Sequence, residues 1–192
     1  MAESLNDNAG GSHRVCPAEA SGWLTTPLRK LFNNPQRILN GLVHRGDVAM
    51  DLGCGPGYFT LPLAEMVGET GTVIAVDVQQ EMLDRLAARA EKAGLASRIQ
   101  LRRSDPAGPS IFGPADFALA FWMLHEVPDP AAFLRAVYGS LKPGATFLLV
   151  EPAGHVSKKR FEATVEAVRQ VGFTPVARPR VGLSRAALFS RL

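Results

Sequence analysis

From about residue 48 onward, the chain alternates short apolar runs with longer amphipathic stretches, and glycine or proline marks most of the changeovers. Short apolar runs bounded by turn residues are typical of buried strands, whereas apolar residues spaced three and four apart indicate helices. The pattern predicts strands at 48–52, 72–77, 99–102, 116–121 and 145–150. It predicts helices at 59–67, 80–93 and 130–141, with Gly68 and Gly94 ending the first two.

The last part of the chain continues the same alternation. Ser157 is placed to cap a helix that Gly172 ends, and the segments 174–178 and 186–190 are typical of a closing hairpin. Repeated strand and helix units predict an α/β, doubly wound, mostly parallel sheet with helices on both faces and an antiparallel last strand. Ligands of such sheets bind at the carboxyl ends of the strands.

The region before residue 45 has a different character. Residues 1–13 are polar and glycine-rich, which predicts a flexible N-terminus. Residues 14–44 are predicted to form a helical cap, with two short helices interrupted by Pro27 and Pro35. Two interpretations of this cap stay open, namely simple edge packing and a lid over the active site.

Composition narrows the classes of protein. Hydrophobic residues make up 46% and charged residues 20% of the 192 residues, which is ordinary globular usage. The longest apolar run, 117–124, is far shorter than the roughly 18 residues of a membrane helix, and the N-terminus does not resemble a secretory signal, so we expect a soluble cytoplasmic protein. Cys16 and Cys54 stand apart, which argues against a disulfide framework and a metal site. The net charge of +3 is scattered and is weak evidence for a nucleic-acid partner.

The most informative segment is a glycine-rich loop between the first strand and the first helix, Asp51-Leu-Gly-Cys-Gly-Pro-Gly57. Its glycines permit backbone angles and a close ligand approach that side chains would block. A dinucleotide fingerprint requires GxGxxG, whereas this loop has GxGxG preceded by the carboxylate of Asp51. That carboxylate would repel a pyrophosphate but suits a ligand bearing ammonium and sulfonium charge. A nicotinamide dehydrogenase is therefore the weaker interpretation.

Five sequence segments occur in the order typical of a known enzyme family, at 48–60, 73–83, 102–106, 116–127 and 141–152. The chain resembles the class I S-adenosylmethionine-dependent methyltransferases, and most of all the small-molecule enzymes of ubiquinone and menaquinone biosynthesis. The resemblance implies a Rossmann-like domain over residues 45–192. It also implies S-adenosylmethionine as cofactor and S-adenosylhomocysteine as product.

The resemblance also implies a set of cofactor contacts. Asp77 ends the second strand, where a carboxylate can accept hydrogen bonds from both ribose hydroxyls. Asp105 takes the position that meets the adenine amino group, although an Asp-Pro turn is an open alternative. Cys54 is interpreted as a small loop filler, because no neighbouring base would activate its thiol. The full set is Asp51, Gly53, Cys54, Gly55, Gly57, Tyr58, Asp77, Val78, Met82, Ser104, Asp105, Pro106 and Phe121.

Two of these contacts have open alternatives of their own. Met82 fits either the adenine pocket or the core side of its helix. Tyr58 either closes over the methionine end of the cofactor or starts the helix facing outward.

The segment after the fourth strand is where the family contacts its acceptor. Phe121 and Trp122 can form the walls of an apolar pocket near the sulfonium. His125 can take a proton from an acceptor hydroxyl or thiol, and Glu126 can orient it or pair with a cation. His125 can equally be a loop hydrogen-bond donor, and His155 carries the same ambiguity. Holding two reactants in line supplies roughly 7 to 11 kcal/mol, so methyl transfer does not require a base.

The sequence therefore predicts a methyltransferase that transfers a methyl group to a small-molecule acceptor by in-line displacement. An RNA methyltransferase and an S-adenosylmethionine-binding protein without transferase activity are the alternatives. The basic groups 158–160 and 178–180 are interpreted as solvated surface, so nucleic acid is not expected as a partner and neither is a membrane. A homodimer is left open.

Overall fold

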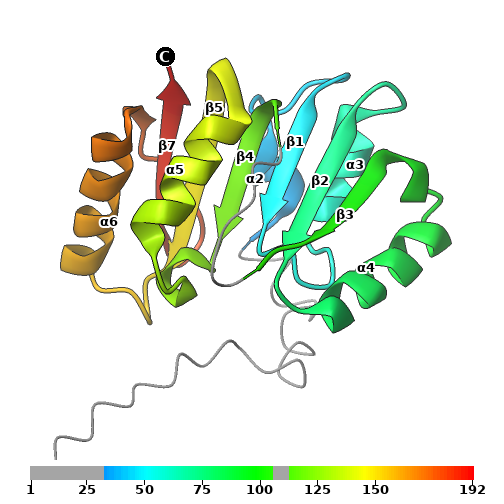
Figure 1. Cartoon of the computed structure of the whole chain (residues 1–192), viewed down its shortest axis with the longest axis horizontal. Coiled ribbons are helices and arrows are strands. Elements are labelled where there is room, and N and C mark those ends of the chain that lie inside the picture. Colours follow the sequence, from blue (N-terminus) through cyan, green and yellow to red (C-terminus); the bar gives the residue numbers. More distant parts are fainter. Residues whose placement is uncertain (1–32, 106–112) are drawn as a thin grey trace, which may run out of the picture.

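The computed structural model describes residues 33–105 and 113–192, which form one seven-stranded sheet (Figure 1). The strand order is β3-β2-β1-β4-β5-β7-β6. Strands β1 to β5 pair with one another in parallel, and β7 is antiparallel to both β5 and β6. The strands are β1 (Val48–Leu52), β2 (Thr72–Asp77), β3 (Ile99–Arg103), β4 (Ala115–Phe121), β5 (Leu141–Pro152), β6 (Phe173–Ala177) and β7 (Ser184–Arg191).

Helices cover both faces of this sheet, with α5 and α6 in front and α2 and α3 behind in Figure 1. The α-helices are α2 (Pro35–Leu39), α3 (Thr60–Val67), α4 (Gln80–Lys92), α5 (Pro130–Ser140) and α6 (Lys158–Val171). The described residues also contain two 3-10 turns, η2 (Ala96–Arg98) and η3 (Leu124–Glu126). The doubly wound, mostly parallel α/β fold that the sequence predicts is confirmed.

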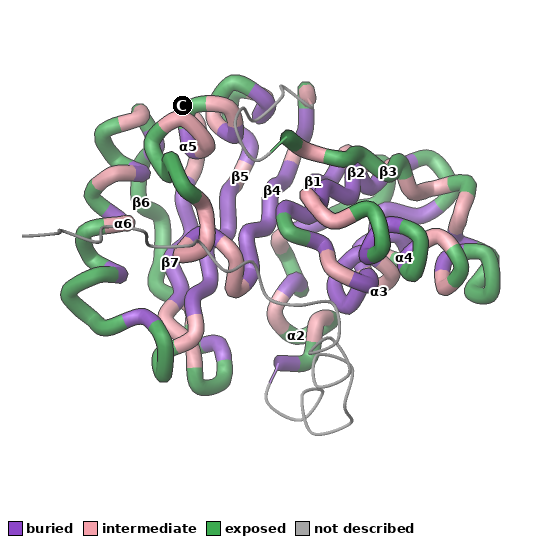
Figure 2. The backbone as a smooth tube through the Cα atoms, turned by 60° about the horizontal axis from the view of Figure 1, so that its bottom comes forward, coloured by how far each residue is buried: buried purple, intermediate pink, exposed green. Residues whose placement is uncertain are grey.

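The core consists of two layers because side chains alternate between the two faces of each strand. Met50 and Phe147 face α5 and α6, where Phe161 completes the layer. Ala49 and Leu148 face the opposite way, toward α2 and α3. Figure 2 shows the central strands buried between these layers, while β3 and β6 at the two edges are largely exposed.

The helix ends follow their sequence signals. The side chain of Asp129 accepts a hydrogen bond from the N–H of Ala132 at 2.9 Å, and Pro130 takes the first turn of α5. The hydroxyl of Ser157 accepts from the N–H of Arg160 at 3.2 Å and starts α6. The left-handed conformation of Gly172 ends that helix.

One predicted boundary is wrong. The sequence predicts a turn before a strand at 145–150, whereas β5 begins at Leu141. Leu141 is buried and pairs with Ala115, and an irregularity then shifts the register before Thr146 pairs with Phe117. Gly144 has φ +82° within this irregular stretch, so the glycine absorbs the distortion without ending the strand.

Some predictions fall outside the described residues. These are the flexible segment 1–13, the cap as far as residue 32, Cys16 and Pro106. Within the described part of the cap, α2 matches the second of the two short helices. No helix among residues 33–105 and 113–192 is long and apolar enough to cross a membrane.

Candidate cofactor and acceptor site

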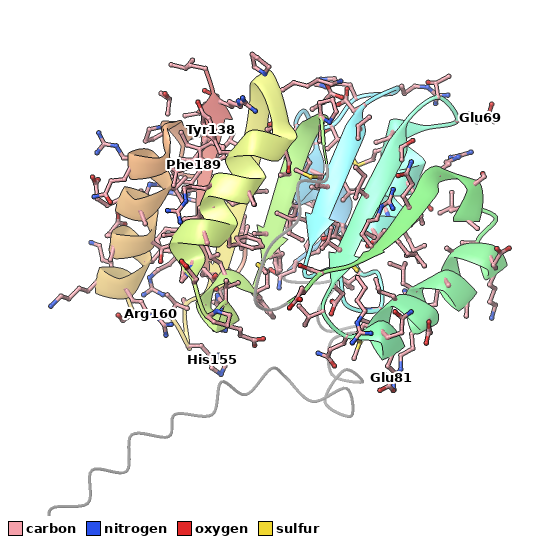
Figure 3. The ribbon with its side chains drawn as sticks, viewed as in Figure 1. Glu69, Glu81, Tyr138, His155, Arg160 and Phe189 are labelled. Carbon is pink, nitrogen blue, oxygen red and sulfur yellow. The ribbon has the colours of Figure 1, made fainter. Side chains whose placement is uncertain are left out.

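The loops that follow the parallel strands meet at one edge of the sheet. In Figure 3, Glu81 at the start of α4 and His155 and Arg160 after β5 lie along this lower edge, and Glu69 lies at the opposite one. The glycine loop follows β1, and the segment from Trp122 to Glu126 follows β4. This carboxyl edge therefore gathers the residues that the sequence singles out.

Main-chain hydrogen bonds fold the glycine loop back onto β2. The N–H groups of Gly53 and Cys54 both donate to the carbonyl of Val76, at 2.8 and 3.0 Å. The glycines at 53, 55 and 57 have φ values of +70°, +51° and +87°, which side-chain-bearing residues rarely adopt. A Cβ at residue 57 would collide with Leu86 of α4, whereas a Cβ at residue 55 would meet no atom within 4 Å. The loop thus packs tightly at its end and leaves open space above its centre.

Asp77 closes this loop from the neighbouring strand. One carboxylate oxygen accepts the N–H of Gly55 at 2.8 Å, and the other accepts the N–H of Gln79 at 2.9 Å. Burial raises the pKa of Asp77 above its ordinary value, while the N–H groups of Gln79, Gly55 and Val78 act in the opposite direction. A carboxylate has about four acceptor positions, so at least one stays open for a ligand beside these three backbone donors. Together with the open space at Gly55, this arrangement fits a ligand that bears hydroxyl groups.

The side chains of Asp51 and Cys54, at the glycine loop, are buried and do not lie on an exposed surface of the site. The Asp51 carboxylate is 2% exposed and accepts the hydroxyl of Thr60 at 2.6 Å, which joins β1 to the start of α3. Burial raises the pKa of the Cys54 thiol far above its ordinary value, and the carboxylates of Asp51 and Asp77 raise it further. Cys54 is therefore an inert filler in chemical terms, and the contact of Asp51 with the cofactor's ammonium group stays a prediction.

Three predicted aromatic contacts lie in or beside the core. Tyr58 is buried and donates its hydroxyl to the carbonyl of Asn33 at 2.9 Å, so the outward-facing alternative is wrong. Phe121 packs on Phe59 with ring centroids 4.3 Å apart. Trp122 lies next to Phe121 and donates its indole N–H to the hydroxyl of Ser184 at 3.0 Å. The aromatic wall is anchored to α3 and β7.

The residues predicted to surround the adenine follow β2 and β3. Met82 lies on α4 and is only 4% exposed, and Val78 is half-buried. Ser104 ties the two strand ends together by donating its N–H to the carbonyl of Asp77 at 2.9 Å. Asp105 is exposed. These positions surround Asp77, and their contact with adenine stays a prediction.

His125 has a partner that the sequence does not single out. Its Nδ1 lies 2.5 Å from one oxygen of Glu151, and its backbone N–H donates to the other at 3.1 Å. The bond to Glu151 raises the pKa of His125 above its ordinary value. Glu126, which the sequence proposes as the orienting group, has its oxygen 3.8 Å from Nε2 of His125, beyond hydrogen-bond distance. Glu151 could have been found as an acidic residue ending an apolar strand, the signal that identifies Asp77.

Met123 joins the two parts of the edge. A Cβ at Gly53 would lie 2.8 Å from the Cβ of Met123, so the segment after β4 rests directly on the glycine loop. This segment begins with Trp122, whose φ of +61° is strained for an aromatic residue. The strained turn places Met123 against the loop and His125 beside Glu151.

The amino edge of the sheet carries a separate hollow of about 260 Å³, lined in part by Leu42, Asp47 and Lys142. Its ion pair joins the amine of Lys142 to both oxygens of Asp116 at 2.8 Å. None of the predicted site residues lines it. Across the two described ranges, no group of three or more His, Cys, Asp or Glu residues is placed to hold a metal ion.

Together, the doubly wound sheet and the carboxylate beside a glycine loop define a nucleoside-binding α/β domain. A model of the methyltransferase domain family matches residues 49–144. The chain belongs to this methyltransferase domain family. The cofactor of the class is S-adenosylmethionine, and the residues around Asp77 fit it.

Individual relatives agree with this assignment. Demethylmenaquinone methyltransferase of Lactobacillus johnsonii is 36% identical over 110 residues, which cover 57% of this chain and 45% of that protein. Ubiquinone/menaquinone biosynthesis C-methyltransferase UbiE of Escherichia coli is 29% identical over 141 residues, which cover 73% and 54%. The chain thus spans about half the length of these two relatives.

A solved structure shows the same fold. The crystal structure of a SAM-dependent methyltransferase from Aquifex aeolicus matches with a TM-score of 0.82 and 23% identity, covering 92% of this chain and 99% of that one.

Proposed function

We propose that this domain transfers a methyl group from S-adenosylmethionine to a small-molecule acceptor by in-line displacement. The observation that carries the proposal is the contact of Met123 with Gly53, because it brings the cofactor loop and the segment of His125 to one edge. Alignment of two reactants on a shared edge is the main requirement of such a reaction.

Each residue has a defined task in this proposal. Asp77 accepts the two ribose hydroxyls, and the buried charge of Asp51 favours the ammonium group of the methionine part. Val78, Met82 and Ser104 border the adenine. When bound, S-adenosylmethionine supplies a methyl carbon whose bond to sulfur breaks with the electron pair returning to sulfur. The rings of Phe121 and Trp122 favour the positive charge next to them.

A narrower acceptor class follows from the relatives. The name of the first relative gives demethylmenaquinone as its substrate, and the name of the second describes a C-methyltransferase of ubiquinone and menaquinone biosynthesis. We propose a hydroquinone ring as the acceptor of this domain. The half-buried His125 beside Glu151 supports this choice, because a hydroquinone carries a hydroxyl proton for a base to remove.

The experiment is methyl transfer from isotopically labelled S-adenosylmethionine, followed by mass spectrometry. The acceptors are reduced short-chain demethylmenaquinone and, in parallel, a metabolite extract and total RNA. We expect acceptor-dependent S-adenosylhomocysteine and a labelled small molecule. Label in RNA alone would favour the RNA methyltransferase, and calorimetric binding of the cofactor without transfer to any acceptor would favour a binding protein.

A further inference from the structure

Glu151, the next-to-last residue of β5, carries a buried carboxylate that the cofactor proposal does not use. Its side chain is 2% exposed. Both of its oxygens are within hydrogen-bond distance of one residue, one oxygen of the backbone N–H and the other of Nδ1 of His125. Burying a carboxylate is costly unless it is well hydrogen-bonded, so a carboxylate committed twice to one histidine indicates a task at that histidine.

We propose that Glu151 is a positioning residue that holds His125 as the general base for an acceptor carrying a phenolic or enolic hydroxyl. This inference rests on the proposed function and adds the residue that orients the base. A carboxylate only accepts hydrogen bonds, so the contact with Glu151 requires the proton of the neutral imidazole to sit on Nδ1. Nε2 then has an available lone pair. The second bond, to the backbone N–H, fixes the position of the whole residue.

The charges around His125 are arranged for this task. Glu151 and Glu126 both favour the protonated imidazole that forms when a proton is taken up. Arg160 of α6 opposes it, yet its guanidinium donates to the carbonyl of His125 at 3.1 Å and so holds the turn in place. The side chain of His125 is 18% exposed, in contrast to the enclosed Glu151, so the pair reaches the surface at the histidine.

The proton step balances within the site. The acceptor O–H bond breaks as Nε2 of His125 forms an N–H bond, and the oxygen keeps the electron pair. That pair, on the oxygen or on a ring carbon conjugated with it, forms the new bond to the methyl carbon that the cofactor supplies. When the ring carbon is methylated, its C–H bond then breaks, the proton leaves to solvent, and the electron pair restores the aromatic ring. The imidazolium stays paired with Glu151 until its proton leaves to solvent.

The chemistry of the base selects the acceptor class. Phenolic hydroxyls ionise near pH 10, close enough to histidine for partial proton transfer in the transition state. A neutral amine attacks with its own lone pair and needs no prior deprotonation. A thiol is partly ionised without help near neutral pH. A base held by a carboxylate therefore suits a phenol or an enol best.

The first test reads the tautomer directly by ¹⁵N NMR of the histidine-labelled protein, with His125→Gln assigning the signal. We expect neutral His125 to carry its proton on Nδ1 and to titrate above the ordinary range. In Glu151→Gln that preference is lost and the titration moves to lower pH, while the matched Glu126→Gln changes it less. A wild-type imidazole protonated on Nε2 would overturn the inference, and this reading needs no variant of Glu151.

The second test follows kcat against pH with reduced short-chain demethylmenaquinone. We expect Glu151→Gln to lower kcat at least tenfold and to move the rising limb of the profile to lower pH, and Glu151→Asp to restore part of the rate. Calorimetry should show unchanged S-adenosylmethionine binding in both variants. An unshifted profile with a near-normal rate in Glu151→Gln would refute the positioning role. A wild-type protein that does not bind the cofactor would instead refute the proposed function and leave the NMR result standing.

Discussion

The two halves of the carboxyl edge are built differently. The cofactor half, at the ends of β1 and β2, consists mostly of main-chain groups: the N–H groups of Gly53, Gly55 and Gln79 and the single carboxylate of Asp77. The acceptor half, at the ends of β4 and β5, depends on a side-chain contact between His125 and Glu151. Both halves join residues from two neighbouring strands, but the cofactor half includes a contiguous glycine motif, whereas the acceptor half depends on two separate side chains.

Because of this difference, substitutions in the two halves should affect different properties of the protein. A glycine loop held in place by main-chain hydrogen bonds suits one constant ligand, because its shape follows from backbone geometry alone. Side chains on neighbouring strands can change without altering the loop. We therefore expect changes in the acceptor half to affect turnover and changes in the cofactor half to affect binding.

The largest expected effect is on turnover. His125→Ala should lower kcat by about 10² to 10⁴-fold, the usual contribution of a general base. Binding of S-adenosylmethionine, measured by calorimetry, should stay within a few-fold of wild type. His155→Ala is the matched control, because that histidine is exposed at the same edge. A rate within a few-fold of the parent would remove His125 as the base.

The next effect is on cofactor affinity. Asp77→Ala should weaken binding of S-adenosylmethionine at least tenfold, because each lost hydrogen bond to a charged group is worth about 1.5 to 3 kcal/mol. Asp84→Ala on the exposed side of α4 provides the control, and Asp77→Asn keeps the size of the side chain. Equal affinity of wild type and Asp77→Ala in calorimetry would disprove the cofactor assignment.

Two glycine variants distinguish effects on the cofactor half from effects on the acceptor half, because, of the two glycines, only Gly53 contacts Met123 of the acceptor half. Both Gly53→Ala and Gly55→Ala place a side chain at positive φ, at a cost of roughly 1 to 2 kcal/mol. Only residue 53 would press on Met123, so Gly53→Ala should lower kcat several-fold as well. Gly55→Ala should act on affinity alone, because its Cβ enters only the open space above the loop. Identical kinetic profiles of the two variants would contradict this division.

The smallest effect concerns the amino edge. Desolvation raises the pKa of Asp116, but hydrogen bonds from Lys142 and the N–H of Val48 outweigh it and hold the pKa below its ordinary value. A depressed folded-state pKa stabilises the protein above the ordinary carboxyl pKa, and this contribution is lost as pH falls through the depressed value.

Lys142→Met should therefore lower the free energy of unfolding by about 0.2 to 1 kcal/mol near neutral pH, with less effect in acid. Urea unfolding at two pH values measures it. Catalysis should not change. A large loss of activity would contradict our placement of the active site at the carboxyl edge of the sheet.

The sequence predicts most of the fold and the cofactor half, because both depend on local patterns. Alternating apolar runs define strands that bury both faces, the GxGxG loop closely follows Asp51, and Asp77 is the polar residue that ends an apolar strand. Glu151 escaped prediction because its partner is 26 residues away and the contact depends on the pairing of Phe121 with Val150. The start of β5 was missed because a glycine such as Gly144 is typical of a turn. Here Gly144 lies inside the strand and takes up a local irregularity at φ +82°.

The most direct test of the whole account is a crystal structure with S-adenosylhomocysteine bound. We predict both ribose hydroxyls on the carboxylate of Asp77, the ligand over Gly55, and its sulfur facing the segment from Trp122 to Glu126. A ligand bound in the hollow beside Lys142, or one whose ribose makes no contact with Asp77, would contradict the account.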